Sequence, residues 1–446
     1  MSVYPKIKTR LPGPKSKRII KQDEKYVSPS YTRTHPVVID RGEGAALWDV
    51  DGNRFLDFHS GIGVTSTGNV HPRVVGAAIR QMKRAMHVAT ADFYHQPVAD
   101  LAKKITSIAP GKGPKRVFFT NSGTEAVEAA FKLARYNRRR PRTIAFINAF
   151  HGRTMGALSL TCSKRTQRLR FAPLVPEVTH VPYAYCYRCP YHLSFPSCNF
   201  HCVQVIEDVY LNKVAPAEEV AALIVEPIQG EGGYVVPPPG YHQRLKKMCE
   251  KHDILFIADE VQSGMGKTGK MFAIEHWGTV PDIIAAAKAL GSGLPIGAAI
   301  ASAKLMSWDR GAHSTTFGGN PVACAAALET IKLLEGGLMR NAERIGRVMM
   351  EQLSRMMHRH DIIGDVRGKG LMIGAEIVRD KKSKKPAPDW ADDIMMEAFR
   401  RGLMLLTAGL NTLRIVPPLI ISEDQAMAGL SILEKSITAV ESRKKK

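Results

Sequence analysis

Short apolar runs alternate with amphipathic stretches along most of the chain, and this alternation limits the fold more than any other feature. The runs have the length of strands, and stretches such as residues 240–253 have the spacing of a helix with one apolar side. Strands that are apolar throughout are typical of a parallel sheet covered on both faces. The pattern therefore predicts an α/β fold with a mainly parallel sheet. The strand-like runs are RVFFT (116–120), TIAFI (143–147), ALIVEPI (222–228), ILFIADEV (254–261) and DIIAAA (282–287).

The two ends of the chain differ from this central part. Residues 44–58, GAALWDVDGNRFLDF, place two apolar runs around Asp-Gly-Asn, which predicts a β-hairpin. Residues 336–446 mix helical and short strand-like patterns, which predicts a smaller α+β domain. We therefore expect an N-terminal segment, 1–75, that contributes to the small domain, a large domain over 76–335, and the small C-terminal domain over 336–446.

The chain is strongly basic, with a net charge of +22 over 446 residues. Such a balance can indicate a nucleic acid, a membrane surface or an anionic ligand as partner. The excess is spread over separate runs, among them RRRPR (138–142) and KKSKKP (381–386), which favours a solvated surface. No apolar signal core follows the first residues, and the one membrane-length stretch, 283–303, is interrupted by Lys288 and Pro295. We expect no nucleic acid, no membrane and a cytoplasmic location.

One strand-like run ends in a turn that suits a phosphate. In FFTNSGTEAVEAAFKLAR the turn Ser122-Gly123-Thr124 opens a helical pattern, and a helix N-terminus offers free N–H groups and a positive dipole end. The alternative is an ordinary helix cap by Ser or Thr. SGMGKTGK (263–270) resembles a nucleotide-binding loop, but Val261 stands where that loop requires glycine, which excludes an NTPase of this kind.

An acid and a lysine follow two neighbouring strand-like runs. Asp259 and Glu260 end one run, and Lys288 follows the next within AAAKALGSGLPIG. Ligands bind at the carboxyl ends of strands in open α/β sheets, so these residues are expected to face one crevice. A lysine in such an apolar run loses its proton more easily and can form a Schiff base. Lys267 is a rival, but it lies in a polar glycine turn where we expect no burial to lower its pKa.

An aldehyde cofactor explains this combination. Pyridoxal phosphate needs a lysine for its aldehyde, a carboxylate for its pyridine nitrogen, a helix N-terminus for its phosphate and an aromatic face for its ring. Lys288, Asp259, the Ser122–Thr124 turn and Phe150 could supply these groups. Phe150 could equally belong to the core.

From residue 35 to about 440 the chain resembles the class III (ω-amino acid) aminotransferases, which are fold-type I pyridoxal phosphate enzymes. The resemblance rests on motifs in family order, which are WDVDGNRFLDFHSGIGV, TNSGTEAVEAAFKLAR, FHGRTMGALSL, VEPIQGEGGY, IADEVQSGMGKTG, AKALGSGLPIGA, TTFGGNPVACAAAL, VRGKGLMIGAE and LRIVPPL. It implies a large domain with a mainly parallel sheet flanked by helices, and a smaller α+β domain.

The resemblance also implies roles for single residues. Lys288 matches the Schiff-base lysine and Asp259 the partner of the pyridine nitrogen, and these two are the expected catalytic residues. The other matches are Gln262 near the ring hydroxyl, Ser122, Gly123 and Thr124 at the phosphate, Phe150 on the ring with His151 beside it, Thr316 reaching the phosphate of the neighbouring subunit, Glu226 and Arg414 as a paired acid and base for substrate, and Ile62 with Gly63 in the pocket wall. A homodimer with its active site at the subunit interface is implied.

The expected reaction is transamination. Lys288 carries a proton between the amine-bearing carbon and the cofactor, and a 2-oxo acid such as 2-oxoglutarate takes up the amino group. Arg414 can bind a carboxylate, and the acid expected beside it can neutralise it when another substrate end enters. By resemblance 4-aminobutyrate is the first donor to consider, then ornithine or acetylornithine. An amino acid racemase or epimerase of the same family remains an alternative, and a basic nucleic-acid-binding protein is a third.

Four of the seven cysteines lie close together in CYRCPYHLSFPSCNFHC. Cys186 and Cys189 form one short-spaced pair, and Cys198 and Cys202 form another. Two such pairs in a cytoplasmic protein are typical of a structural zinc site or an iron–sulfur cluster, with His192 and His201 as spare ligands. The alternative is a surface loop whose cysteines are reduced or disulfide-bonded. We expect any metal to fix a long excursion of the chain without joining the chemistry.

Overall fold

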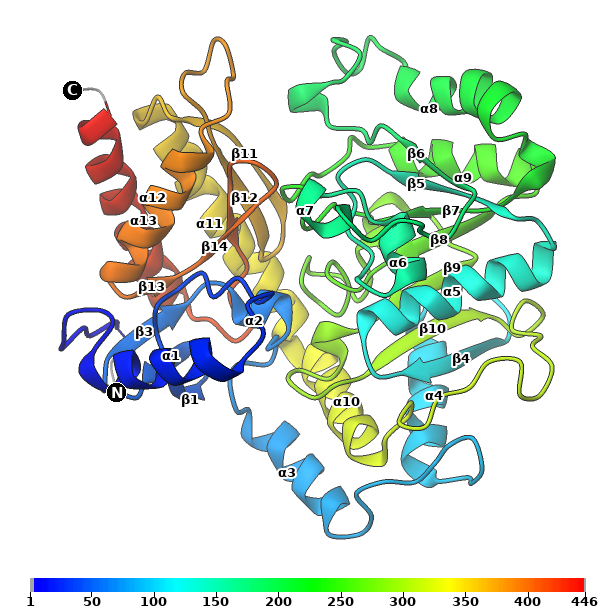
Figure 1. The fold of residues 1–446 in the computed structure, drawn as a ribbon, viewed down its shortest axis with the longest axis horizontal. Helices are drawn as coiled ribbons and strands as arrows, with labels where there is room; N and C mark the ends of the chain where they lie inside the picture. Colours follow the sequence, from blue (N-terminus) through cyan, green and yellow to red (C-terminus); the bar gives the residue numbers. More distant parts are fainter. Residues whose placement is uncertain (1–3, 445–446) are drawn as a thin grey trace.

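The computed structural model describes residues 4–444 and contains one large and two small sheets (Figure 1). The first three residues of the expected N-terminal segment and the last two of the C-terminal domain lie outside the described residues. The helices are α1 (Pro14–Tyr26), α2 (Ser60–Gly63), α3 (Pro72–Met82), α4 (Gln96–Ile108), α5 (Gly123–Arg138), α6 (Met155–Leu160), α7 (Arg165–Arg168), α8 (His201–Val205), α9 (Tyr241–Lys251), α10 (Pro321–Leu333), α11 (Met339–Arg359), α12 (Pro388–Arg400) and α13 (Glu423–Lys444).

The large sheet has seven strands in the order β4-β10-β9-β8-β7-β5-β6. Its strands are β4 (Lys115–Thr120), β5 (Arg142–Phe146), β6 (Val178–Val181), β7 (Val220–Val225), β8 (Leu255–Asp259), β9 (Ile283–Ala286) and β10 (Gly297–Ser302). From β6 to β9 the neighbours run parallel, whereas β10 is antiparallel to both β4 and β9. The α/β fold with a mainly parallel sheet is therefore confirmed, and the five strand-like runs are strands.

Helices cover both faces of this sheet, which explains why its central strands are apolar throughout. On β8, Ile257 packs in the same cluster as Val127 and Phe131 of α5. The adjacent Phe256 belongs to the cluster that contains Leu245 of α9 and Ile105 of α4. Since successive side chains of a strand point to opposite faces, α5 and the pair α4 and α9 cover opposite sides. The sheet is thus the middle layer of three.

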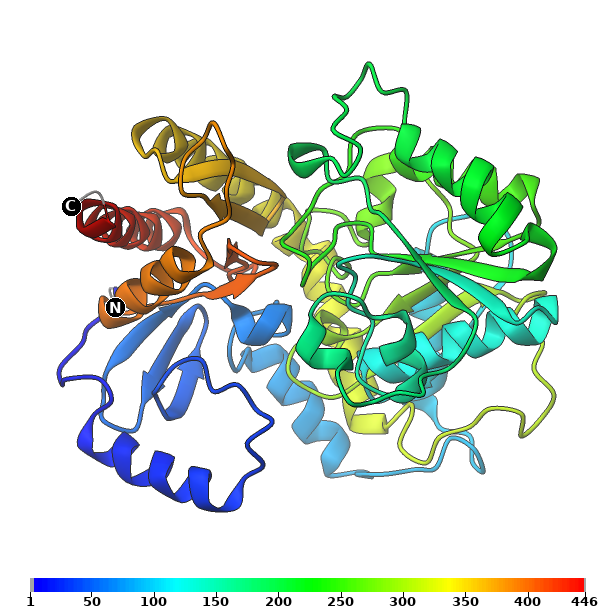
Figure 2. The same cartoon turned by 45° about the horizontal axis from the view of Figure 1, so that its top comes forward.

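The two small sheets join the ends of the chain. One has the order β1-β2-β3-β13, and the predicted hairpin forms its β2 (Ala46–Asp49) and β3 (Arg54–Asp57), beside β1 (Ile39–Glu43) and β13 (Leu403–Met404). The other has the order β11-β12-β15-β14, with β11 (Ile363–Lys369), β12 (Met372–Ile377), β14 (Leu406–Ala408) and β15 (Thr412–Ile415). Because β13 runs parallel to β3, N-terminal and C-terminal residues share one sheet (Figure 2). The domain boundaries at 75 and 335 remain predictions.

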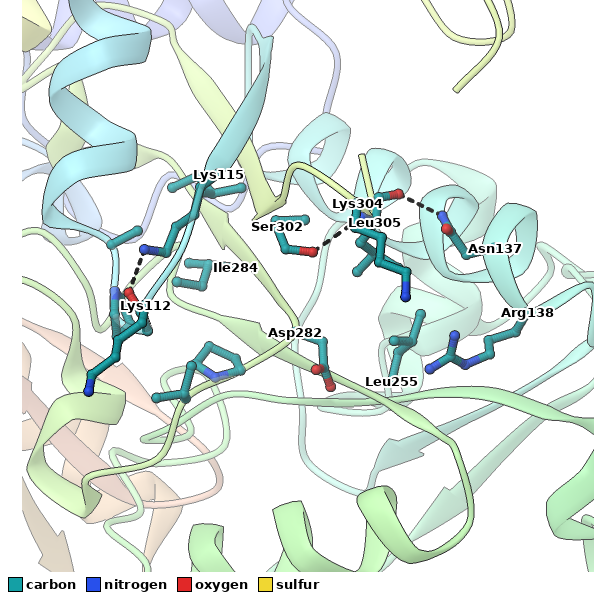
Figure 3. Close-up of a pocket in the computed structure, with 17 residues that line it drawn as sticks. Lys112, Lys115, Asn137, Arg138, Leu255, Asp282, Ile284, Ser302, Lys304 and Leu305 are labelled. Atoms are coloured by element: carbon teal, nitrogen blue, oxygen red, sulfur yellow. Dashed lines mark hydrogen bonds between the residues drawn. The ribbon is translucent and has the colours of Figure 1, made fainter. Parts of the chain in front are cut away.

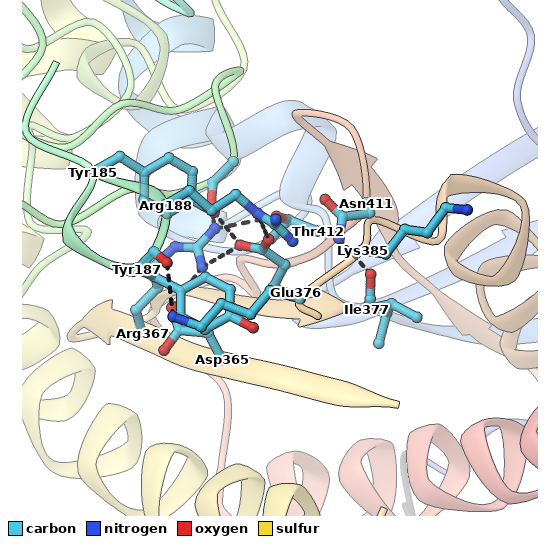
Figure 4. A network of polar contacts seen from close by, with 12 residues as sticks. Tyr185, Tyr187, Arg188, Asp365, Arg367, Glu376, Ile377, Lys385, Asn411 and Thr412 are labelled. Atoms are coloured by element: carbon cyan, nitrogen blue, oxygen red, sulfur yellow. Dashed lines mark hydrogen bonds and ion pairs between the residues drawn. The ribbon is translucent and has the colours of Figure 1, made fainter. Parts of the chain in front are cut away.

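The cysteine-rich excursion lies between β6 and α8 and is tied to the sheet β11-β12-β15-β14. Figure 4 shows Glu376 of β12 at the centre of this contact, where it accepts hydrogen bonds from Tyr185 and Arg188 of the excursion. Arg367 of β11 completes the network, because its guanidinium lies 2.7 Å from both Asp365 and Glu376. The Glu376 side chain is fully buried, so these charged partners are needed to satisfy it. The excursion is therefore fixed by a buried polar network.

Candidate active site

Lys288 follows β9 at the carboxyl end of the large sheet, where the sequence predicted a crevice. It begins a short 3-10 turn, Lys288–Leu290, with a positive φ of 44°, a conformation that is uncommon outside glycine. Desolvation lowers the pKa of its ammonium group, which is also influenced by the charges of Asp259 and Arg414. The residue nevertheless keeps part of its surface exposed. Lys288 is thus held in a strained position, with a weakened proton and an opening to solvent.

Asp259 ends β8, which pairs with β9 in a register that places Asp259 opposite Ala285. One carboxylate oxygen accepts the backbone N–H of Val261 at 3.0 Å, and the other lies 2.6 Å from Nδ1 of His151. Both side chains are buried, and Nε2 of His151 has no hydrogen-bond partner. Asp259 and His151 therefore form a fixed buried pair beside Lys288.

The turn before α5 has the form expected of an anion site. Ser122 is the N-cap, and its hydroxyl accepts the backbone N–H of Glu125 at 3.3 Å. A Cβ on Gly123 would lie 2.6 Å from Val261, so only glycine lets the turn approach the segment after β8. Thr124 bonds through its hydroxyl to that of Thr154 at 2.8 Å. Ser122, Gly123 and Thr124 are partly exposed, so the positive end of this sixteen-residue helix is accessible.

Glu226 braces the backbone of the site. Its carboxylate accepts the N–H of Phe150 and the N–H of Gly230, each at 3.0 Å. Burial raises the pKa of Glu226 to about 7. Its two oxygens therefore hold the segment that carries Phe150 and His151 against the loop after β7.

Arg414 has a different acidic partner from the one we expected. The sequence analysis paired it with Glu226, but in the structure Nη2 of Arg414 forms its ion pair with Glu231. Both acids belong to the motif VEPIQGEGGY, and only the course of the loop decides which one reaches β15. Glu231 is therefore the partner of Arg414 that sequence reasoning missed, although its motif had been identified. The guanidinium of Arg414 is buried, lies 5.6 Å from the Tyr234 ring, and leaves its Nε without a hydrogen-bond partner.

Three other predicted residues differ in their exposure. Gln262 is buried with its Oε1 unpartnered, in space that Gly230 leaves free, since a Cβ there would lie 2.3 Å from its Nε2. Ile62 is 47% exposed and has a φ of 65°, a rare conformation for a β-branched residue, beside Gly63 at 76°. Thr316 is exposed on the loop before α10.

Lys267 requires a correction. The sequence analysis expected it in a polar, unburied turn, but it is fully buried, and this burial lowers its pKa to about 7. Its Nζ donates to Oγ of Ser60 at 3.0 Å, and Ser60 in turn donates to the backbone carbonyl of Val416. The flanking glycines led to the expectation of an exposed turn, but glycines also allow a turn to fold into the interior. Burial alone therefore does not distinguish the two lysines.

The prediction of a metal at the cysteines also requires a correction. Within residues 4–444, no cluster of three or more His, Cys, Asp or Glu side chains could hold a metal ion. All seven cysteines are free. The four thiols line a hollow together with Tyr, Phe and Pro side chains, and burial raises the pKa of Cys186 and that of Cys202, the latter to about 12. The zinc and iron–sulfur assignments, with His192 and His201 as spare ligands, are not supported.

A larger hollow of about 400 Å³ lies at the opposite end of the strands of the large sheet (Figure 3). It contains Leu255, the first residue of β8, whereas Asp259 is the last residue of that strand. Its acid Asp282 is engaged by Lys246 and by the backbone N–H of Phe256, each at 2.8 Å. This hollow is therefore remote from Lys288 and lacks its convergent unpartnered groups.

Comparisons with known proteins agree with this geometry. A family model described as aminotransferase class-III matches residues 26–437. A probable 4-aminobutyrate aminotransferase of Bacillus subtilis is 38% identical and covers 93% of this chain and 96% of its own length. An alanine/serine racemase of Pyrococcus horikoshii is also 38% identical, with 97% and 93% covered.

The fold agrees with that of a solved transaminase. The structure of an amine transaminase from an uncultivated Pseudomonas species, in its PLP-bound form, is 32% identical with a TM-score of 0.86 and covers 93% of this chain and 98% of that one. The fold-type I architecture expected from the sequence is confirmed. A match that spans the large sheet, both small sheets and the Lys288 crevice, together with these relatives, shows that the chain belongs to the class III aminotransferase family.

Proposed function

We propose that this protein is a pyridoxal-phosphate-dependent transaminase that moves an amino group from an ω-amino acid to a 2-oxo acid. The observation that carries the proposal is that Asp259 and Lys288 end or follow adjacent parallel strands, with the charge of Arg414 acting on Lys288. Unpartnered buried atoms of His151, Gln262 and Arg414 surround the same region. Buried polar atoms without partners are costly, so they fit a site completed by bound polar groups.

The residues fit pyridoxal phosphate in particular. Bound there, the cofactor supplies an aldehyde for covalent attachment and a ring that withdraws electrons from the reacting carbon. Lys288 would hold the aldehyde and, once freed, move a proton at the amine-bearing carbon of the substrate. Asp259 would keep a proton on the ring nitrogen, with His151 orienting the carboxylate. Ser122, Gly123 and Thr124 would hold the phosphate at the N-terminus of α5, Phe150 would cover the ring, and Gln262 would contact its hydroxyl.

Arg414 and Glu231 support a reaction with two unlike substrates. A 2-oxo acid such as 2-oxoglutarate brings a carboxylate that can take the free donors of Arg414 once Glu231 moves aside. A donor that presents no second carboxylate there leaves Glu231 on Arg414. The similarity to the probable 4-aminobutyrate aminotransferase of Bacillus subtilis supports 4-aminobutyrate as the first donor to test, ahead of ornithine or acetylornithine. Glu226 would act through the backbone, and Ile62 would line the pocket wall.

A homodimer is part of the proposal. Exposed apolar residues gather beside the loop of Thr316: Phe317 is 59% exposed and packs on His87 at 5.0 Å, and Phe93 and Tyr94 are 66% and 103% exposed. Asn320 donates to the carbonyl of Met86 at 3.0 Å, which joins the two loops. Such a surface is typical of a partner interface, which supports the proposal that Thr316 serves a neighbouring subunit.

Amino acid racemisation is the second candidate, because the alanine/serine racemase of Pyrococcus horikoshii is as similar as the aminotransferase of Bacillus subtilis.

Within residues 4–444, none of the helices combines the length and apolar character that a membrane crossing requires. The proposed location is the cytoplasm, where free cysteines are maintained.

One experiment separates the two candidates. The holoenzyme is incubated with a panel of amines and 2-oxoglutarate, and in parallel with single L-amino acids followed by chiral analysis. Formation of glutamate from 4-aminobutyrate supports the proposal. Accumulation of D-amino acids without any acceptor would replace transamination by racemisation.

A further inference from the structure

We propose that Lys164 is a specificity-determining positioning residue that receives Glu231 when Arg414 binds the carboxylate of a 2-oxo acid. The inference rests on the proposed function, because it concerns how one pocket accepts two substrates. Lys164 lies between α6 and α7 and belongs to none of the predicted site motifs. It would act on the substrate only through Glu231.

The carboxylate of Glu231 is shared between two cations. Its Oε2 forms the ion pair with Nη2 of Arg414, and its Oε1 lies 2.7 Å from Nζ of Lys164. The side chains of Arg414, Glu231 and Lys164 are 3%, 19% and 42% exposed, so the three charges lead from the buried site toward solvent. Glu231 therefore already contacts the group that can hold it at the outer position.

Hydrogen bonds hold the backbone on both sides of this ion pair. The carbonyl of Glu231 accepts the N–H of Gly409 at 2.7 Å, and the N–H groups of Gly233 and Tyr234 bond to the carbonyl of Gly230. Arg414 is held in β15, where it pairs with Gly374 of β12 and with Leu406 of β14. An incoming carboxylate must therefore displace the Glu231 side chain while both backbones stay in place.

Displacement would be costly without a second cation. A partly buried carboxylate that loses its counter-charge pays a desolvation penalty that is not offset. Burial favours the protonated acid, but Arg414 and Lys164 outweigh it and hold the pKa of Glu231 below its ordinary value. With Lys164 present, Glu231 keeps one ion pair as it leaves Arg414. Without Lys164, Glu231 is held by Arg414 alone, and carboxylates should bind less well.

An ordinary exposed ion pair would behave differently. Such pairs contribute little to stability and have no reason to favour one substrate over another. Lys104 provides a matched control, because its Nζ lies 2.7 Å from Glu335 at 32% exposure and neither residue belongs to the proposed site. The inference is therefore tested by selectivity for carboxylates.

The experiment compares the wild-type holoenzyme with Lys164→Met, Lys164→Arg and Lys104→Met. Calorimetry measures the Kd for glutarate, a dicarboxylate without a reactive oxo group, and steady-state kinetics measure KM for 2-oxoglutarate and for the amino donor. We expect Lys164→Met to raise both the Kd for glutarate and the acceptor KM by roughly threefold to tenfold. The donor KM and kcat should stay near wild type, Lys164→Arg should restore binding, and Lys104→Met should change nothing.

The binding measurement keeps this inference separate from the proposed function. If the wild-type enzyme transfers no amino group but Lys164→Met still weakens glutarate binding, the inference holds and the proposed reaction fails. An unchanged Kd for glutarate in Lys164→Met would overturn the inference whatever the reaction is. Equal losses for donor and acceptor, or no glutarate binding by the wild type, would also overturn it.

Discussion

Within residues 4–444, Lys267 and Lys288 both carry a desolvated ammonium group, but the surroundings of the two groups differ. Lys267 is fully enclosed, and its ammonium group donates to the hydroxyl of Ser60. Lys288 is partly open to solvent and lies within the influence of Asp259, Glu226, Glu231 and Arg414. Desolvation lowers the pKa of both ammonium groups. A more easily lost ammonium proton is thus common to both lysines. Only the exposure of Lys288 to solvent and the charged groups around it indicate catalysis.

Substitution of each lysine gives the largest contrast. Lys288→Ala removes the covalent attachment and the acid–base group, so transamination should fall on the order of 10⁴-fold. Lys267→Met preserves the size of the side chain, and Lys267 has no proposed contact with the cofactor or the substrate. The rate should therefore stay close to wild type. Initial rates with saturating cofactor measure both. Comparable loss in the two variants, with folding intact by circular dichroism, would remove the distinction between them.

The charge beside Lys288 provides the next test. Asp259→Asn keeps the shape but removes the negative charge, so the ring nitrogen would no longer be held protonated. We expect the rate to fall roughly 10²- to 10³-fold. Single-turnover absorbance changes of the cofactor with excess donor report this step directly. A rate within a few-fold of wild type would assign Asp259 to structure.

The arginine that faces Lys288 should show substrate selectivity. Arg414→Ala removes a charge-assisted contact worth about 1.5–3 kcal/mol, which is roughly a 10- to 150-fold loss in kcat/KM for 2-oxoglutarate. The loss should be smaller for acceptors such as pyruvate that lack the second carboxylate. Equal losses for both acceptors would argue against a carboxylate contact at Arg414.

Lys267 should influence stability through pH. Its pKa is about 7 in the folded chain and near 10.5 when unfolded, so between these values the unfolded state binds the extra proton. The Lys267 contribution to stability therefore increases as pH rises from about 7 to about 10.5. Urea unfolding over this range should show a smaller increase for Lys267→Met than for wild type. Parallel pH profiles would show that Lys267 does not titrate as its burial indicates.

The site was predictable where residue type and chain order decide the chemistry. The strand-like runs before Asp259 and Lys288 predicted that both residues lie at the carboxyl ends of neighbouring strands, because parallel strands end at the same side of a sheet. The partner of Arg414 was not predictable, since two glutamates of one loop could reach it. Strand β10 was not predicted, because its run GAAIAS lacks the large apolar side chains that are typical of a strand. It is a strand because its backbone pairs with β4 and β9.

The cysteine-rich excursion should show the smallest effect. Tyr185 and Arg188 hold the excursion against Glu376, so this contact does not depend on a metal ion. Treatment with a chelator should leave the Tm unchanged, and elemental analysis should find less than about one-tenth of a metal ion per chain. A stoichiometric metal whose removal lowers the Tm would restore the metal-site assignment.

The identity of the covalently modified lysine tests the central claim most directly. Reduction of the holoenzyme with borohydride fixes the cofactor to the lysine that holds it, and mass spectrometry of the peptides then identifies that residue. The account predicts that the label lies on Lys288, in the peptide that follows β9. A label on Lys267, whose pKa is also lowered by desolvation, would contradict it.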